Sequence, residues 1–208
     1  MTVANAVQAD SSNARDALED VATILRSHNI EAVVVNTAAD ARTAVLAMIP
    51  EGAEVHSGKS KTLEDVGLYG EIVESGRYDA LRPRLFQMDR KTQGREMRKL
   101  VAAPDVELGS VAAITADGTL VAASATGSQL GPYAAGAGRL ILIVGSQKLV
   151  PDLDAALRRI HEVVFPWENA QVRERLGVDT ILAKVLLIYA EWQPGRTTVV
   201  LVRAPVGV

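Results

Sequence analysis

A Gly-Lys-Ser turn between an apolar run and a helix carries the side chains best suited to chemistry in this chain. The run over residues 54–57 ends at Ser57 and is followed by Gly58, Lys59 and Ser60. A helix begins near Thr62, which can cap it with Asp65 as the capping partner. The free N–H groups and positive dipole end of such a helix, beside a lysine and hydroxyls, suit a phosphate or carboxylate. An ordinary capped strand–helix connection accounts for the same residues, so both interpretations stay open.

Two further loops hold residues of a similar kind. Ser146 and Lys148 follow the most apolar run of the chain, residues 140–144, and ligands of open α/β sheets gather where strands end. A solvated lysine in a strand–helix loop is an equal alternative. The loop over residues 126–131 would let a ligand approach the backbone closely, although such loops are often only turns; its candidate binding residues are Gly127, Ser128 and Gln129.

Two residues are candidates for proton transfer if the chain is an enzyme, which the sequence leaves undecided. His56 lies beside the Gly-Lys-Ser turn and histidine titrates near neutral pH, but a histidine satisfied by a neighbour is the commoner state. Asp117 could act as a base, yet Asp-Gly between two β-type runs indicates a hairpin turn first.

Composition and motif spacing exclude several classes of function. The 208 residues contain no cysteine, which removes disulfides, thiolate metal sites and iron–sulfur clusters. The three histidines are scattered, so we predict no metal and no cofactor. A formal charge of -3 gives no reason to expect nucleic acid. No apolar stretch approaches the ~20 residues of a membrane span, and the N-terminus resembles no secretion signal, so we expect a cytoplasmic protein.

Two nucleotide-binding patterns are incomplete. The Gly-Lys-Ser turn lacks the first glycine of a phosphate-binding P-loop, because Ala53 occupies that position. Gly136 and Gly138 precede a strand, whereas the glycines of a dinucleotide loop follow one.

Apolar periodicity predicts strands alternating with helices. Residues 1–11 are small and polar and predict a flexible tail, and residues 12–208 predict one α/β domain. Thr37 and Asp40 form a second capping signal. We expect a three-layer, Rossmann-like α/β/α fold with a mostly parallel sheet and an antiparallel hairpin or edge. The expected strands cover residues 30–35, 54–57, 106–115, 119–124, 140–144, 182–189 and 197–202, and the expected helices 12–28, 41–49, 62 onward, 93–103, 151–164 and 169–176.

Four segments, in this order and spacing, resemble the lactate-utilisation (LUD) domain family; they cover residues 58–68, 115–128, 144–150 and 194–202. The resemblance implies a fold similar to glucosamine-phosphate deaminase, ribose-phosphate isomerase and coenzyme A transferases, and a link to oxidation of lactate or related acids. Many members carry a cysteine cluster that is absent here. Where members often have an acidic residue and then Gly-Asn-Arg, this chain has Ala116 and Gly127-Ser128-Gln129.

Together these patterns lead to two functional hypotheses. In the first, the three loops form a crevice for a small anionic metabolite, with Lys59 and Lys148 balancing its charge and Ser60 and Thr62 orienting it. In the second, the chain is a non-catalytic accessory subunit of an oxidoreductase complex whose redox cofactors lie on other subunits. The resemblance also makes a homo-oligomer plausible.

Overall fold

The computed structural model describes residues 17–208, and the predicted tail, residues 1–11, lies outside them. Residues 17–27 form a helix. The other helices are α2 (Ala38–Met48), α3 (Lys61–Val66), α4 (Leu68–Glu74), α5 (Leu81–Gln87), α6 (Gly94–Ala102), η1 (Pro132–Gly136), η2 (Ser146–Lys148), α7 (Leu153–Arg159), η3 (Ile160–Val164) and α8 (Phe165–Leu176). The strands are β1 (Glu31–Val35), β2 (Glu54–Ser57), β3 (Asp79–Ala80), β4 (Val106–Gly109), β5 (Ala113–Thr115), β6 (Leu120–Ser124), β7 (Arg139–Gly145), β8 (Leu149–Val150), β9 (Lys184–Ile188) and β10 (Thr197–Val202).

Six strands form a central sheet in the order β1-β10-β7-β4-β2-β3, and every neighbouring pair is parallel. A second, mixed sheet has the order β8-β5-β6-β9. The expected α/β class with a mostly parallel sheet is therefore confirmed. The expected hairpin, β5 with β6, lies in this second sheet rather than at an edge of the first.

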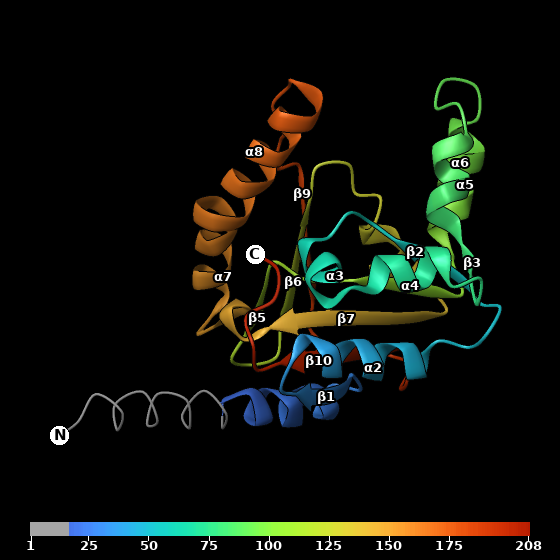
Figure 1. Ribbon diagram of the computed structural model, residues 1–208. Coiled ribbons are helices and arrows are strands. Elements are labelled where there is room, and N and C mark those ends of the chain that lie inside the picture. The colour runs from blue at the N-terminus through green and yellow to red at the C-terminus, as the bar shows by residue number, and fades with distance from the viewer. Residues whose placement is uncertain (1–16) are drawn as a thin grey trace.

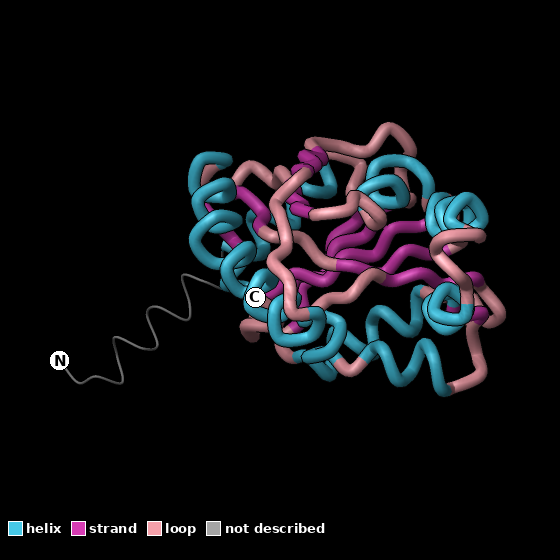
Figure 2. The backbone as a smooth tube through the Cα atoms, turned by 90° about the horizontal axis from the view of Figure 1, so that it is seen from above, coloured by secondary structure: helices cyan, strands magenta, loops and turns pink. Residues whose placement is uncertain are grey.

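Alternate residues of the central strands fill two apolar cores. On one face, Ile141 and Ile143 of β7 pack against residues of α2, α3 and α4. On the other face, Leu140 and Leu142 pack against the helix over residues 17–27 and against β5 and β6. A third core lies between the second sheet and α7 with η3. Figure 1 shows α7 and α8 on one side of the molecule, with α5 and α6 on the other. Figure 2 shows the strands enclosed between helices.

Two elements differ from the expectation. The run over residues 106–115 divides at Ser110 into β4 of the central sheet and β5 of the second sheet, so the chain changes sheets beside the carboxyl end of β4. Pro166 does not end a helix. The π-helical turn η3 precedes it and joins α7 to α8, and such turns accommodate local breaks in the helical ladder.

Among the helices of residues 17–208, none has the length and apolar character needed to cross a membrane.

Candidate functional site

The carboxyl ends of three neighbouring strands bring together a lysine and two hydroxyl groups. Thr62 follows β2 on helix α3, Ser110 follows β4, and Lys148 follows β7 on the short helix η2. These strands are adjacent in the parallel sheet order β7-β4-β2, so their ends meet at the same edge. Ligands of open α/β sheets bind at this edge.

Lys148 is the centre of this cluster and its side chain is almost fully enclosed, with 3% of the residue exposed. Its Nζ donates hydrogen bonds to Thr62 Oγ1 at 2.8 Å, Ser110 Oγ at 2.9 Å and the Val111 carbonyl oxygen at 3.2 Å. Ser110 Oγ in turn donates to the Ile143 carbonyl oxygen at 2.6 Å. All three of these partners are neutral oxygens, so no carboxylate in the described part of the chain balances the charge of the amine by direct contact.

Burial lowers the pKa of Lys148 to about 7, since removal from water disfavours the charged form. The positive charge of Arg159 on α7 lowers the pKa further, and Asp65 on α3 raises it. A lysine with this pKa holds a substantial fraction of neutral amine at neutral pH. Strong shifts of this kind concentrate at functional sites, although structural ion networks produce them too.

The segment after β10 lies over the cluster. The Gly207 N–H donates to Asp65 Oδ2 at 2.8 Å, and Gln147 Nε2 donates to the Val206 carbonyl oxygen at 2.9 Å. A Cβ atom on Gly207 would stand 2.0 Å from Thr62 Oγ1 and 3.1 Å from Lys148 Nζ. Gly207 also has a φ of 79°, so only glycine lets the backbone pass this close to the lysine.

A second polar pair lies in the strands themselves. His56 of β2 and Glu107 of β4 are register partners, and His56 Nδ1 is 2.6 Å from Glu107 Oε2. Both side chains are buried, and Oε1 of Glu107 has no partner among the described residues. Burial raises the pKa of Glu107 to about 7 despite the hydrogen bond and charge of His56, which lower it. Glu107 therefore holds a substantial fraction of the protonated acid at neutral pH.

Two tyrosines hold the loops at the ends of β2 and β4. Tyr133 Oη accepts from the Ser110 N–H at 3.1 Å and packs on Gly109, where a Cβ would be 1.7 Å from that oxygen. Tyr69 Oη donates to the Gly58 carbonyl oxygen at 2.5 Å and accepts from the Ser60 N–H at 2.6 Å. Tyr69 therefore fixes the Gly-Lys-Ser turn and uses one of the N–H groups expected to face a ligand.

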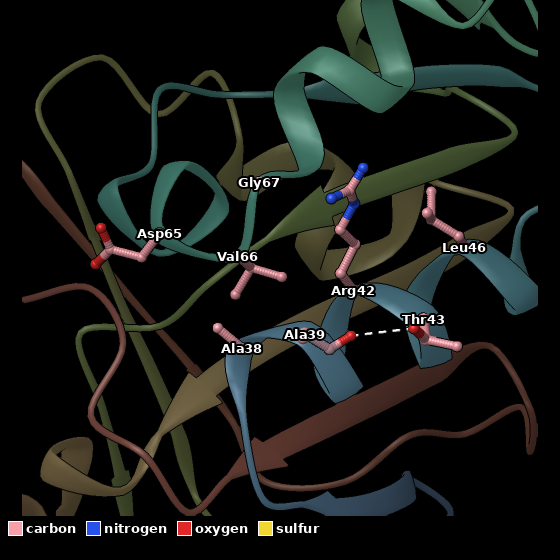
Figure 3. Close-up of a pocket in the computed structure, with 8 residues that line it drawn as sticks. All are labelled: Ala38, Ala39, Arg42, Thr43, Leu46, Asp65, Val66 and Gly67. Carbon is pink, nitrogen blue, oxygen red and sulfur yellow. Dashed lines mark hydrogen bonds between the residues drawn. The ribbon is translucent and has the colours of Figure 1, made fainter.

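A surface pocket lies near Asp65, between α2 and α3 (Figure 3). Its one arginine, Arg42, is paired with Glu71. Of the lining residues, Asp65 also accepts the hydrogen bond from the Gly207 N–H. The pocket is lined by Ala38, Ala39, Arg42, Thr43, Leu46, Asp65, Val66 and Gly67. Among residues 17–208, no group of three His, Asp or Glu side chains is arranged to hold a metal ion.

The structure places the predicted residues of the Gly-Lys-Ser turn in different surroundings. Lys59 is exposed and makes no hydrogen bond within residues 17–208, so it does not join Lys148. Ser60, rather than Thr62, caps helix α3 by accepting from the Leu63 N–H at 3.4 Å. The predicted Thr62 cap was wrong because Thr62 lies inside the helix, where its hydroxyl faces Lys148. Ser57 is buried, and its carbonyl oxygen accepts from Arg82 at 3.4 Å.

The other predicted residues lie apart from the lysine cluster or contact it only through the backbone. The polar contacts of Gly127, Ser128 and Gln129 are made among themselves and with neighbouring residues of the loop and of β6. Asp117 binds Thr115 and Thr119, which lowers its pKa and makes it the anchor of the hairpin turn. Ser146 begins η2, and its carbonyl oxygen accepts from the Leu149 N–H.

Glu107, Ser110 and Arg159 are among the residues of these sites that were not predicted. Glu107 carries the strongest signal in retrospect, because a carboxylate interrupts an otherwise apolar run at residues 106–109. Ser110 gives no signal, since its role depends on the chain changing sheets there. Arg159 follows Arg158 at the end of a helix, and such a pair is typical of an exposed last turn.

Comparison with known proteins agrees with this architecture. The model of the LUD domain family matches residues 18–202. A crystal structure of a DUF162 family protein from Deinococcus radiodurans is similar in fold, with a TM-score of 0.51 and 13% sequence identity. The similarity covers 91% of this chain and 98% of that one. No curated protein matches the sequence. Because the family model spans most of its length, the chain belongs to the LUD domain family.

Proposed function

We propose that this LUD domain protein is cytoplasmic and binds a small anionic metabolite, a carboxylate or a phosphorylated compound, at the carboxyl ends of β2, β4 and β7. By this proposal it serves the utilisation of lactate or a related organic acid. The observation that supports it most is Lys148, a buried amine whose direct partners are all neutral oxygens.

The energetic argument concerns the charge of this lysine. Burying an ammonium group without a counter-ion costs several kcal/mol, and an apolar side chain of similar size avoids that cost. An anion bound beside Lys148 would recover much of the cost by charge attraction in surroundings of low dielectric. The hydroxyls of Thr62 and Ser110 would then orient the ligand as well as the lysine.

The test is a thermal-unfolding panel on wild type, Lys148→Met and Lys59→Ala. The compounds are lactate, pyruvate, other hydroxy acids, sugar phosphates and inorganic phosphate. A ligand at a hundred times its Kd stabilises by about 2.7 kcal/mol, and therefore raises the Tm by several degrees. We expect the shift in wild type and in Lys59→Ala, the exposed-lysine control, and its loss in Lys148→Met.

If the ligand still raises the Tm of Lys148→Met, then it binds at a site that does not include Lys148. The absence of any shift with the whole panel would refute the proposal for the isolated chain.

A second candidate function is that of an accessory subunit in an oxidoreductase complex. The specific observation in its favour is the segment from the end of α8 to the residues after β9, which exposes six large apolar side chains, including Trp192 at 98%. Large exposed apolar patches mark interaction sites. The six residues are Leu176, Val178, Ile181, Val185, Tyr189 and Trp192.

Affinity purification from native cells distinguishes the two candidates. The subunit hypothesis predicts recovery of a flavin- or iron–sulfur-containing protein that is lost with Trp192→Asp and retained with Lys148→Met. Recovery of the chain alone would refute it.

A further inference from the structure

Arg159 presents one edge of its guanidinium group without a partner. Its Nε and Nη2 atoms are both buried and have no hydrogen-bond partner among the described residues. These two atoms form the fork that binds both oxygens of a carboxylate or phosphate in parallel. Buried arginine N–H groups nearly always have acceptors, so this unpaired fork is suited to a two-oxygen anion.

The fold places this fork near Lys148. Helix α7, which ends at Arg159, packs against β5 and β8 of the second sheet. Lys148 immediately precedes β8. After burial, the positive charge of Arg159 is the next cause that lowers the pKa of Lys148. Two cations therefore share one region of the protein, and within residues 17–208 neither contacts a carboxylate.

A lysine that is desolvated and adjacent to another cation has the properties of an amine nucleophile. Both effects favour the neutral amine, whose lone pair can attack a carbonyl carbon. Thr62 and Ser110 fix the position of the nitrogen through bonds of 2.8 Å and 2.9 Å. An ordinary exposed lysine such as Lys59 has neither the desolvation nor this fixed geometry.

We propose that the site accepts a 2-oxo acid, whose carboxylate binds the Arg159 fork while Lys148 attacks its carbonyl carbon and forms an imine. The inference rests on the proposed function and adds the substrate class and a covalent step. The nitrogen lone pair forms the new C–N bond, and both C–O bonds to the former carbonyl oxygen break. That oxygen leaves as water with the two protons of the amine, so no oxidant or reductant is consumed.

Access to the amine requires movement of the segment after β10. Gly207 lies directly over Thr62 and Lys148, and three hydrogen bonds hold the segment, from its N–H to Asp65 and from Gln147 to the carbonyl oxygens of Val206 and Gly207. The negative charge of Asp65 also raises the pKa of Lys148, opposing the effect of Arg159. Replacing Asp65 with Asn should therefore both loosen this cover and favour the neutral amine.

The test is reductive trapping of the full chain with pyruvate and sodium borohydride, followed by intact mass and peptide mapping. We expect one pyruvate adduct, on Lys148. Its yield should rise about tenfold from pH 6 to pH 8, because the neutral fraction of a group with a pKa of about 7 rises by that factor. Because peptide mapping locates the adduct in the wild-type protein, this result does not depend on whether a variant folds.

Matched arginine variants test the fork. Arg159→Met should lower the yield about tenfold, the factor typical for loss of a charge-assisted pair, whereas Arg158→Met, its exposed neighbour on α7, should not. No adduct at pH 8, equal labelling of Lys59 and Lys148, or equal effects of the two arginine variants would each overturn the inference. A further outcome separates the two proposals. If lactate or phosphate stabilises the protein only when Lys148 is present, but borohydride traps no pyruvate adduct, the imine is refuted and the proposed anion site remains.

Discussion

Replacing Lys148 with Met should change how the stability of the protein depends on pH. The unfolded lysine has a pKa of 10.5, and burial lowers the folded value to about 7. Between these values the unfolded state binds a proton that the folded state does not. The free energy of unfolding of wild type therefore rises with pH across this window, by up to about 1.4 kcal/mol per pH unit. Below pH 7 Lys148 is charged in both the folded and the unfolded state, so the folded protein bears the full free-energy cost of burying the ammonium group.

The expected magnitude follows from the two pKa values. From pH 7 to pH 9, Lys148 adds about 2 kcal/mol to the stability of wild type, because the folded state is half protonated at the start of this range. Lys148→Met lacks this contribution. For a chain of this size the difference corresponds to about 4–8 °C in Tm. The contribution from Glu107 cancels, since both proteins contain this residue.

The assay is urea unfolding of wild type, Lys148→Met and Lys59→Met at pH 7, 8 and 9. Lys148→Met should be most stable relative to wild type at pH 7 and lose that advantage by pH 9. The exposed control, Lys59→Met, should follow wild type at every pH. Parallel pH curves for wild type and Lys148→Met would refute the claim that Lys148 is desolvated in the folded protein.

Three further predictions concern neighbouring positions. Gly109→Ala should destabilise by about 1–3 kcal/mol, because its Cβ would overlap Tyr133; an unchanged Tm would contradict this packing. Ser60→Ala should cost about 1 kcal/mol in urea unfolding through loss of the α3 cap, while Ser60→Asp keeps it; equal losses would argue against capping. Glu107 has a pKa raised by burial, so wild-type stability should fall from pH 5 to pH 7 relative to Glu107→Gln. Melting curves with the same pH dependence would show that Glu107 is not desolvated.

Local patterns were sufficient to predict the class of fold. The apolar run of β7 and the capping box of Thr37 and Asp40 both occur as expected. Each depends on residues close in sequence, where periodicity and capping chemistry operate. The predicted strand boundaries were wrong where long-range packing determines them. One predicted strand, residues 106–115, divides at Ser110 into strands of two different sheets.

The site could be predicted only in part, because it depends on which strand ends are neighbours. Thr62 and Lys148 were both candidates, but their contact requires β7, β4 and β2 to be consecutive in the sheet. Lys59 has the same residue type as Lys148 and a more suggestive motif, yet it points to solvent. Residue type and motif indicate which chemistry is possible. What distinguishes these two lysines is burial, since Lys148 is buried and Lys59 is exposed.

The most direct test of the anion site is NMR of the Lys148 side chain during ligand addition. In protein labelled with [13C]lysine, the ε-methylene signal of Lys148 is assigned by its absence in Lys148→Met. At pH 8 we expect lactate or inorganic phosphate to move this signal toward the position of the charged form, because a bound anion raises the pKa of the amine. The Lys59 signal should stay in place. A Lys148 signal that no anion of the panel moves would contradict the account.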